Sequence, residues 1–405
     1  MSKLQIACIE KGFFGTIIKN LDKLARAAAI RSVRRKTPID SKKIVFLNFS
    51  GNYECNPKYI CQRLIDEGVD FKPVWGINKD TQLSPGSFPS QVKTVIRETY
   101  AFYKEISGAK IIVDNGISLV TVSYPKKKGQ YVIETWHGSL GIKKFGRSSN
   151  QDRLWLARAE KQGKITDFII SNSDMEDDIY REDFWKTTPL WKFGHPRNDV
   201  LFCDDKKAGE LDRRIRSRFK IPENTKLCLY APTFRDDGDV SPYTIDYQAL
   251  SDALSEKFGG SFVILTRFHW RMRDLMKTYH LPGNVIDVSS YEDIQELERI
   301  IDVGITDYSS WICEYMLRRK PGFTFATDVK NYAGHERQLF FPLSALPFPT
   351  SSDMDGLLKS IKDFDNDKYI SDCDAFLKEK GSVDDGQAAK RTAAEIKKLM
   401  AGGTR

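Results

Sequence analysis

Three of the five histidines in this 405-residue chain stand in short polar motifs that follow apolar runs. They are His137 in YVIETWHGSLG, His195 in FGHPRND and His269 in LTRFHW. An imidazole titrates near neutrality, so it suits the removal of a proton from a hydroxyl group. His137 should emerge at the carboxyl end of a strand, where Gly138 lets backbone and substrate approach closely. We interpret His137 as a general base, and the simpler alternative is a hydrogen-bonded histidine that ends a strand.

The residues that follow His137 could bind the acceptor, which is the substrate whose hydroxyl gives up a proton. Two glycines and a Lys-Lys pair lie within nine residues of His137. We therefore assign Gly138, Ser139, Lys143 and Lys144 to the acceptor side of the site.

Cationic side chains follow two apolar runs in the second half of the chain. Arg267 and His269 share a face at the period of a strand, where they could grip a phosphate and stabilise a leaving group. The alternative for this pair is a solvated strand edge. Arg235 follows the run KLCLYAPTF with Thr233, and it is either a phosphate ligand or a salt bridge that closes two domains.

The stretch GITDYSSWICEYMLRRKP predicts a strand, a turn at Asp307 and a helix that begins at Ser309 or Ser310 and ends before Pro321. Free hydroxyls and N–H groups at such a helix start can bind a pyrophosphate. Glu314, one turn into this helix, either reaches ribose hydroxyls or pairs with Arg318 four residues on.

Short β-branched runs that alternate with helical patterns must position these residues. The alternation begins near residue 43 and restarts at KLCLYAPTFRD, which predicts two Rossmann-like, doubly wound α/β domains that face a cleft. Ligands of such sheets bind at the carboxyl ends of the strands. We expect a basic arm (1–42), an acceptor-side domain (43–215) and a donor-binding domain (216–380). A polar C-terminal helix with a tail should follow; its pattern begins near residue 377, and we assign it to residues 381–405.

Charge and missing motifs exclude several classes of function. Residues 1–43 contain eleven Lys or Arg and three acids, a net +8 that equals the charge of the whole chain. Because the remaining chain is neutral, no nucleic-acid partner is expected. Dinucleotide, P-loop and nucleophile-elbow motifs are missing, and the seven cysteines have no metal-ligand spacing, so no cofactor or metal is expected. No apolar run is long enough to span a membrane, and no signal peptide is expected.

The N-terminal arm has the pattern of a basic amphipathic helix over residues 12–36. Such a helix can lie on an anionic membrane surface, and we favour that interpretation. The alternative is that its apolar stripe packs on the first domain.

Six motifs in order, NPKYI, ETWHGSLGIKKFG, GHPRNDVL, LYAPTFRD, LTRFH and ITDYSSWICEYMLRRKP, resemble those of the CDP-glycerol glycerophosphotransferase family over residues 43–345. The resemblance implies a GT-B-type fold at the cytoplasmic face of the bacterial membrane and a role in teichoic acid or capsule synthesis. It implies that His137 is the catalytic base and His269 a second essential histidine, and that Asp307, Ser309 and Ser310 contact the donor phosphates. The chain departs from the family in WHGSLGIKK, which lacks the usual proline, and at Glu314, where an aspartate is usual.

These observations lead to the hypothesis of a peripheral membrane enzyme that transfers a polyol phosphate from CDP-glycerol or CDP-ribitol to a lipid-linked glycan or growing polymer. His137 would deprotonate the acceptor hydroxyl, and Arg235, Arg267, His269, Asp307, Ser309, Ser310 and Glu314 would hold the donor. The alternatives are a glycosyltransferase of the same architecture and a membrane-associated protein that binds polymer without catalysis.

Overall fold

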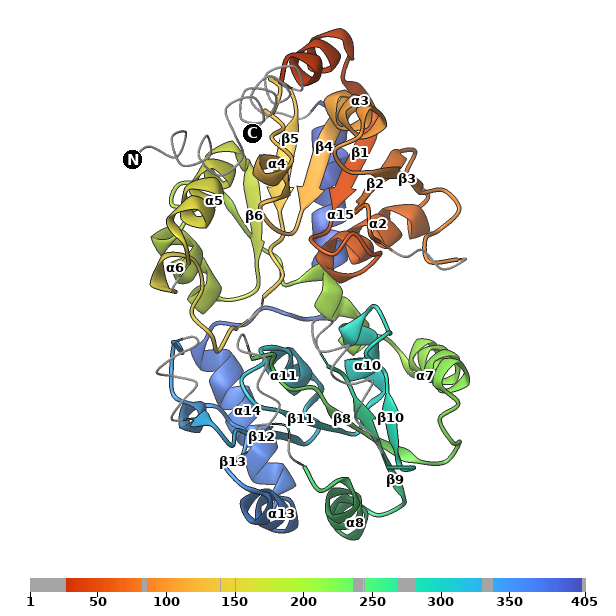
Figure 1. The fold of residues 1–405 in the computed structure, drawn as a ribbon, viewed down its shortest axis with the longest axis vertical. Coiled ribbons are helices and arrows are strands. Elements are labelled where there is room, and N and C mark those ends of the chain that lie inside the picture. The colour runs from red at the N-terminus through yellow and green to blue at the C-terminus, as the bar shows by residue number, and fades with distance from the viewer. Residues whose placement is uncertain are drawn as a thin grey trace, which may run out of the picture.

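Two α/β domains lie one above the other in the computed structural model (Figure 1). The structure describes residues 27–81, 86–138, 140–149, 151–235, 243, 245–268, 282–329 and 338–402. Each domain contains one sheet, and every strand pairing in both sheets is parallel. The predicted pair of Rossmann-like domains is therefore confirmed.

The first sheet has the strand order β3-β2-β1-β4-β5-β6-β7. The inner strands are largely buried apolar runs because helices cover both faces, whereas the edge strands β3 and β7 are only partly buried. Successive residues of β1 enter two different cores, with Ile44 and Phe46 on one face and Val45 and Leu47 on the other. The strands are β1 (Asp40–Leu47), β2 (Lys72–Ile77), β3 (Lys93–Ile96), β4 (Ala109–Asp114), β5 (Tyr131–Glu134), β6 (Phe168–Ser171) and β7 (Leu190–Lys192). The helices are α2 (Cys55–Asp66), α3 (Tyr100–Gly108), α4 (Ser118–Thr121), α5 (Arg153–Ile165) and α6 (Asp174–Glu182).

The second sheet has the strand order β10-β9-β8-β11-β12-β13. Its strands are β8 (Lys226–Tyr230), β9 (Phe262–Thr266), β10 (Val285–Asp287), β11 (Val303–Thr306), β12 (Gly322–Phe325) and β13 (Thr350–Ser351). The helices around it are α7 (Asp205–Phe219), α8 (Tyr247–Phe258), α10 (Ile294–Ile300), α11 (Trp311–Tyr315), α13 (Met354–Lys362) and α14 (Asn366–Glu379). The short 3-10 helix η2 (Pro196–Phe202) leads from the first domain to α7.

The C-terminal end of the chain returns to the first domain (Figure 1). The polar helix expected from about residue 377 begins later, because α14 ends at Glu379 and the C-terminal helix α15 covers Ala388–Met400. Ala393, Ile396 and Leu399 of α15 are buried in the same core as Ile44 and Phe46 of β1. The helix is therefore polar on one face only, and it ties the two domains together.

The described part of the N-terminal arm packs on the first domain. Residues 27–36 are helical, and the helix ends at Lys36, just before Pro38. Ile30 is buried against the core that contains Val45, and Arg34 donates to the carbonyls of Pro125 and Lys126. Residues 1–26 of the arm lie outside the described residues.

Candidate active site

His137 lies just beyond the carboxyl end of β5, in the position expected from the sequence. Its Nδ1 is 2.6 Å from the carbonyl oxygen of Asn115, which follows β4. A carbonyl only accepts hydrogen bonds, so Nδ1 carries the proton and Nε2 keeps a free lone pair. Burial lowers the pKa of His137 to about 4, despite the opposing effect of the Asn115 carbonyl. The ring is therefore neutral at physiological pH, with Nε2 able to accept a proton.

The backbone before His137 is held in an unusual conformation. Trp136 has a φ of +48°, in a region that bulky residues rarely occupy. Its N–H donates to Oε1 of Glu134 at 2.9 Å, and its carbonyl accepts from Nδ2 of Asn56 at 3.3 Å. The Trp136 ring stacks on the His137 ring with centroids 4.5 Å apart. These contacts offset the backbone strain and fix the direction of the imidazole.

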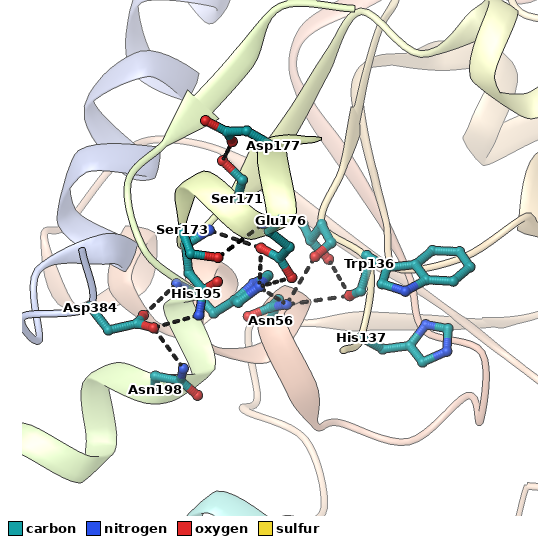
Figure 2. A network of polar contacts seen from close by, with 12 residues as sticks. Asn56, Trp136, His137, Ser171, Ser173, Glu176, Asp177, His195, Asn198 and Asp384 are labelled. Atoms are coloured by element: carbon teal, nitrogen blue, oxygen red, sulfur yellow. Dashed lines mark hydrogen bonds and ion pairs between the residues drawn. The ribbon is translucent and has the colours of Figure 1, made fainter. Parts of the chain in front are cut away.

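A buried polar network lies behind this turn (Figure 2). His195 is completely buried, with Nε2 at 3.0 Å from both carboxylate oxygens of Glu176 and Nδ1 at 3.3 Å from Nδ2 of Asn56. Asn56 Nδ2 also donates to the carbonyl of Thr135 at 3.1 Å. His195 thus supports the residues before His137 from inside the domain, and it does not face the cavity that His137 lines.

The C-terminal linker completes this network. Asp384 accepts from the backbone N–H of His195 at 2.8 Å and from the side-chain amides of Asn172 at 2.7 Å and Asn198 at 3.2 Å. Figure 2 shows Asp384 on the opposite side of His195 from Asn56. The carboxylate therefore fastens the segment between α14 and α15 to the η2 region.

Arg197 connects the His137 turn to the second domain. Its Nη1 donates to the carbonyl oxygen of His137 at 2.9 Å, and its Nη2 donates to Glu314 in α11. The other carboxylate oxygen of Glu314 accepts from Gln295 at 2.7 Å. Glu314 is only 1% exposed, so its carboxylate braces the domain interface instead of reaching a ribose, and its ion-pair partner is Arg197 instead of Arg318.

The Asp307 turn organises the second domain's side of the cleft. Asp307 accepts from the backbone N–H of Thr233 at 2.8 Å, and Arg235 lies 2.8 Å from its other oxygen. Arg235 also pairs with Asp328 at 2.7 Å and is only 3% exposed. All these residues belong to the second domain, so Arg235 neither closes the two domains nor presents its guanidinium to the cleft. It fixes the turn that leads to Ser309 and Ser310.

A cavity of about 440 Å³ brings residues of both domains together. His137, Gly138, Lys143 and Lys144 line it from the first domain, and Ser310 lines it from the second. Ser310 precedes the short helix α11, and its side chain makes no capping hydrogen bond. The predicted base and the predicted donor-side turn therefore share one cavity.

The segment after His137 crosses to the second domain, as the gold loop in Figure 1 shows. Leu140 and Ile142 are buried in the second domain's core, and the Phe340 N–H donates to the Ile142 carbonyl at 2.8 Å. Lys143 Nζ lies 3.4 Å from Thr233 Oγ1, and Lys144 Nζ donates to Gln338 at 3.1 Å. The apolar residues in SLGI thus have a packing role that their position in the motif did not reveal.

Arg267 does not line this cavity. The strand β9 ends at Thr266, so Arg267 lies past its end and donates to the carbonyls of Tyr291 and Glu292. Burial lowers the pKa of Arg267. His269 and Ser139 lie outside the described residues. Within the described ranges, no cluster of His, Cys, Asp and Glu could hold a metal ion. No described helix is long and apolar enough to cross a membrane.

Two parallel α/β domains with a shared cavity between them define a GT-B-type fold. The profile of the CDP-glycerol:poly(glycerophosphate) glycerophosphotransferase family matches residues 29–398, and the chain belongs to this family.

Two curated relatives and one solved structure show the extent of the similarity. The teichoic acid poly(glycerol phosphate) polymerase of Staphylococcus epidermidis is 31% identical over 367 residues, which are 87% of this chain and 50% of that protein. The teichoic acid glycerol-phosphate transferase of Staphylococcus aureus is 26% identical over 397 residues, which are 94% of this chain and 100% of that protein. The structure of the wall teichoic acid polymerase TagF superimposes with a TM-score of 0.80 at 29% identity, and covers 96% of this chain and 97% of that one. This chain therefore spans about half the length of the Staphylococcus epidermidis relative.

The supporting residues were not assigned to the site from the sequence. Asn56, His195 and Arg197 stand in the motifs NPKYI and GHPRND, and these motifs were the available signal. Glu134 stands three residues before His137 in ETWHG. Glu176 and Asp384 lie in no recognised motif, and only the fold brings them to His195.

Proposed function

We propose that this chain transfers glycerol phosphate from CDP-glycerol to a hydroxyl group of a growing teichoic acid polymer and releases CMP. Family membership and the names of the relatives support this assignment. The observation that carries it is the neutral His137, whose unprotonated Nε2 belongs to a ring that lines a cavity shared with Ser310 of the opposite domain. CDP-ribitol is the alternative donor.

In the proposed reaction, the acceptor hydroxyl oxygen attacks the phosphorus that bears the glycerol. The bond between this phosphorus and the bridging oxygen breaks, and the oxygen leaves as part of CMP. His137 Nε2 takes the proton of the acceptor hydroxyl as the new P–O bond forms. Such transfers depend mainly on positioning and on neutralisation of phosphate charge, so no covalent enzyme intermediate is needed.

The donor phosphates are proposed to lie against the turn formed by Asp307, Ser309 and Ser310. Asp307 and Arg235 hold the turn in place, and Ser309 and Ser310 are only partly buried. Lys143 lines the same cavity from the other domain and adds positive charge. His269 and Arg267 remain further donor-side proposals, which rest on the sequence motif LTRFH. Gly138, Ser139, Lys143 and Lys144 remain assigned to the acceptor side.

The proposed domain assignment places the acceptor on residues 43–215 and the donor on residues 216–380, with the arm and the C-terminal helix as connecting parts. All strands of the first sheet lie between Asp40 and Lys192, and all strands of the second between Lys226 and Ser351. Because α15 packs on the first sheet, residues 388–400 belong structurally with the acceptor side.

We also propose that residues 12–36 hold the enzyme on an anionic membrane at the cytoplasmic face, where a lipid-linked acceptor would be found. The net charge of +8 over residues 1–43 supports this location. Deletion of residues 1–26 keeps Ile30 and Arg34, which pack on the first domain. The shortened chain should no longer sediment with anionic vesicles, and unchanged sedimentation would contradict the proposal.

The function is tested by CMP release from CDP-glycerol, CDP-ribitol and a nucleotide sugar, each with an oligo(glycerol phosphate) acceptor. The proposal predicts release from CDP-glycerol that depends on the acceptor. Nucleotide release from the sugar donor alone would identify a glycosyltransferase instead.

A further inference from the structure

A second pocket adjoins the His137 cavity on the first domain. Its volume is about 480 Å³, and its lining includes Phe49, Asn78, Lys79, Arg97 and Ile117. Phe49 and Ile117 also line the His137 cavity, and the Phe49 and His137 rings are 5.0 Å apart. The two cavities are therefore adjacent, and Phe49 and Ile117 line both of them.

Arg97 is an unusual cation in this pocket. Its Nε donates to the Gly76 carbonyl at 3.1 Å, and its Nη2 donates to the Asn48 carbonyl. Within the described ranges no carboxylate forms an ion pair with Arg97, and Asp114 is the acid that acts on it from a distance. Asp114 is fully buried, and its Oδ2 accepts from the Ser118 N–H at 3.0 Å and from Gln162 Nε2 at 3.1 Å, so its carboxylate is hydrogen-bonded to groups other than the guanidinium. A partly buried guanidinium without a paired carboxylate is a favourable place for an anion.

The charge of the pocket agrees with an anionic ligand. Lys79 is exposed on its wall, and no ion pair of Lys79 is found among the described side chains. Glu98 is the one carboxylate among the lining residues, and it is exposed with a φ of +66°. Phe49 is 54% exposed beside these charges, so the wall also offers an apolar surface to the carbon atoms of a ligand.

Arg97 is linked to His137 by a short chain of hydrogen bonds. The Asn48 carbonyl accepts from Arg97, and Oδ1 of Asn48 accepts from Nδ2 of Asn115 at 2.7 Å. The carbonyl of Asn115 then accepts from Nδ1 of His137 at 2.6 Å. Two strand ends, those of β1 and β4, therefore hold the guanidinium and the imidazole in one rigid arrangement.

We propose that the pocket around Arg97 binds the phosphate nearest to the accepting hydroxyl of a polyol-phosphate chain, and so directs that hydroxyl to His137. This inference rests on the proposed function, because it names the acceptor that the same site prefers. The enzyme then extends chains that already carry a polyol phosphate in preference to neutral acceptors.

The test compares two acceptors of similar length, tri(glycerol phosphate) and neutral triglycerol, with the full chain. Calorimetry without donor measures binding of each acceptor, and CMP release from CDP-glycerol measures the KM of each. Arg97→Gln should weaken binding of tri(glycerol phosphate) and raise its KM about tenfold, and leave both values for triglycerol unchanged. Its KM for CDP-glycerol should also be unchanged.

Three surface variants separate charge recognition from loss of structure. Lys79→Gln should weaken the binding of tri(glycerol phosphate) about threefold, and Glu98→Gln should strengthen this binding, because both substitutions change the charge near the phosphate. Lys128→Gln is the matched control, since Lys128 is exposed just before the amino end of β5, whereas the pocket lies at the carboxyl ends of the strands. This control variant should change the binding of neither acceptor.

Equal effects of Arg97→Gln on both acceptors, or no effect of Lys79→Gln, would overturn the inference. Calorimetry distinguishes this failure from failure of the proposed function. Wild-type chain that binds tri(glycerol phosphate) through Arg97 but releases no CMP would refute the reaction and keep the pocket. CMP release without the charge preference would refute the pocket alone.

Discussion

Replacement of Arg197 by Met tests the connection between the two domains and the turn at His137. The side chain is 9% exposed and its partner Glu314 is 1% exposed, so Arg197→Met leaves a buried carboxylate without its counter-ion. Loss of one partner of a buried ion pair costs about 3–5 kcal/mol in the free energy of unfolding. The variant also removes the 2.9 Å hydrogen bond to the His137 carbonyl. A shift of the imidazole by about 1 Å would lower kcat about 100-fold.

The matched experiment is a double-mutant cycle with Glu314→Gln. Each single variant strands one buried partner, whereas the double variant Arg197→Met with Glu314→Gln strands neither charge. Urea unfolding followed by tryptophan fluorescence should therefore show a double variant that is less destabilised than the sum of the singles, by about 1–3 kcal/mol. The kcat of the double variant should stay low, because the His137 carbonyl still lacks its donor. Additive destabilisation, or wild-type kcat in Arg197→Met, would refute the reasoning.

Three further predictions follow from the same geometry. Because the pKa of His137 is about 4, its imidazole stays unprotonated above that pH, so kcat/KM should decrease only when the pH falls to about 4 to 5. A decrease with a midpoint at about pH 6.5 that disappears in His137→Gln would contradict the tautomer and the burial of His137. Ile142→Ala should destabilise the chain by about 2–5 kcal/mol, since Ile142 is fully buried in the second domain's core, while Leu154→Ala at a 56% exposed position serves as a control within about 0.5 kcal/mol. Asp384→Ala leaves three buried donors unpaired and should cost at least about 2 kcal/mol in urea unfolding. Asp385→Ala removes an exposed ion pair with Arg391, worth about 1 kcal/mol or less, and one exposed hydrogen bond from the Gln387 N–H, so it should cost less, and equal losses would refute the structural role of Asp384.

The fold was accessible from the sequence because parallel strands in this chain are continuous apolar runs. The runs KKIVFLNF, KIIVDN and SFVILTRF each contain most of an observed strand. His137 and Ser310, which follow other strands, line the cavity at the cleft. Two of the short strands, β7 and β13, were not predicted, since two or three residues carry no clear periodicity.

The supporting network could not be predicted in the same way. The contact between Asn56 and His195 joins residues 139 apart, and the contact between His195 and Asp384 joins residues 189 apart. The local pattern of residue types along the sequence contains no information on such distant pairs. The burial of Arg235 and Glu314 and their ion-pair partners are consequences of packing that a single sequence does not reveal.

The most direct test of the account is acceptor-dependent CMP release from CDP-glycerol by the wild-type chain and by His137→Gln. Glutamine fills a similar volume but cannot take a proton from the acceptor, so the account predicts a loss of rate of at least about 100-fold. Circular dichroism and the KM for CDP-glycerol should remain unchanged in the variant. Near-normal CMP release by His137→Gln would contradict the assignment of His137 as the base.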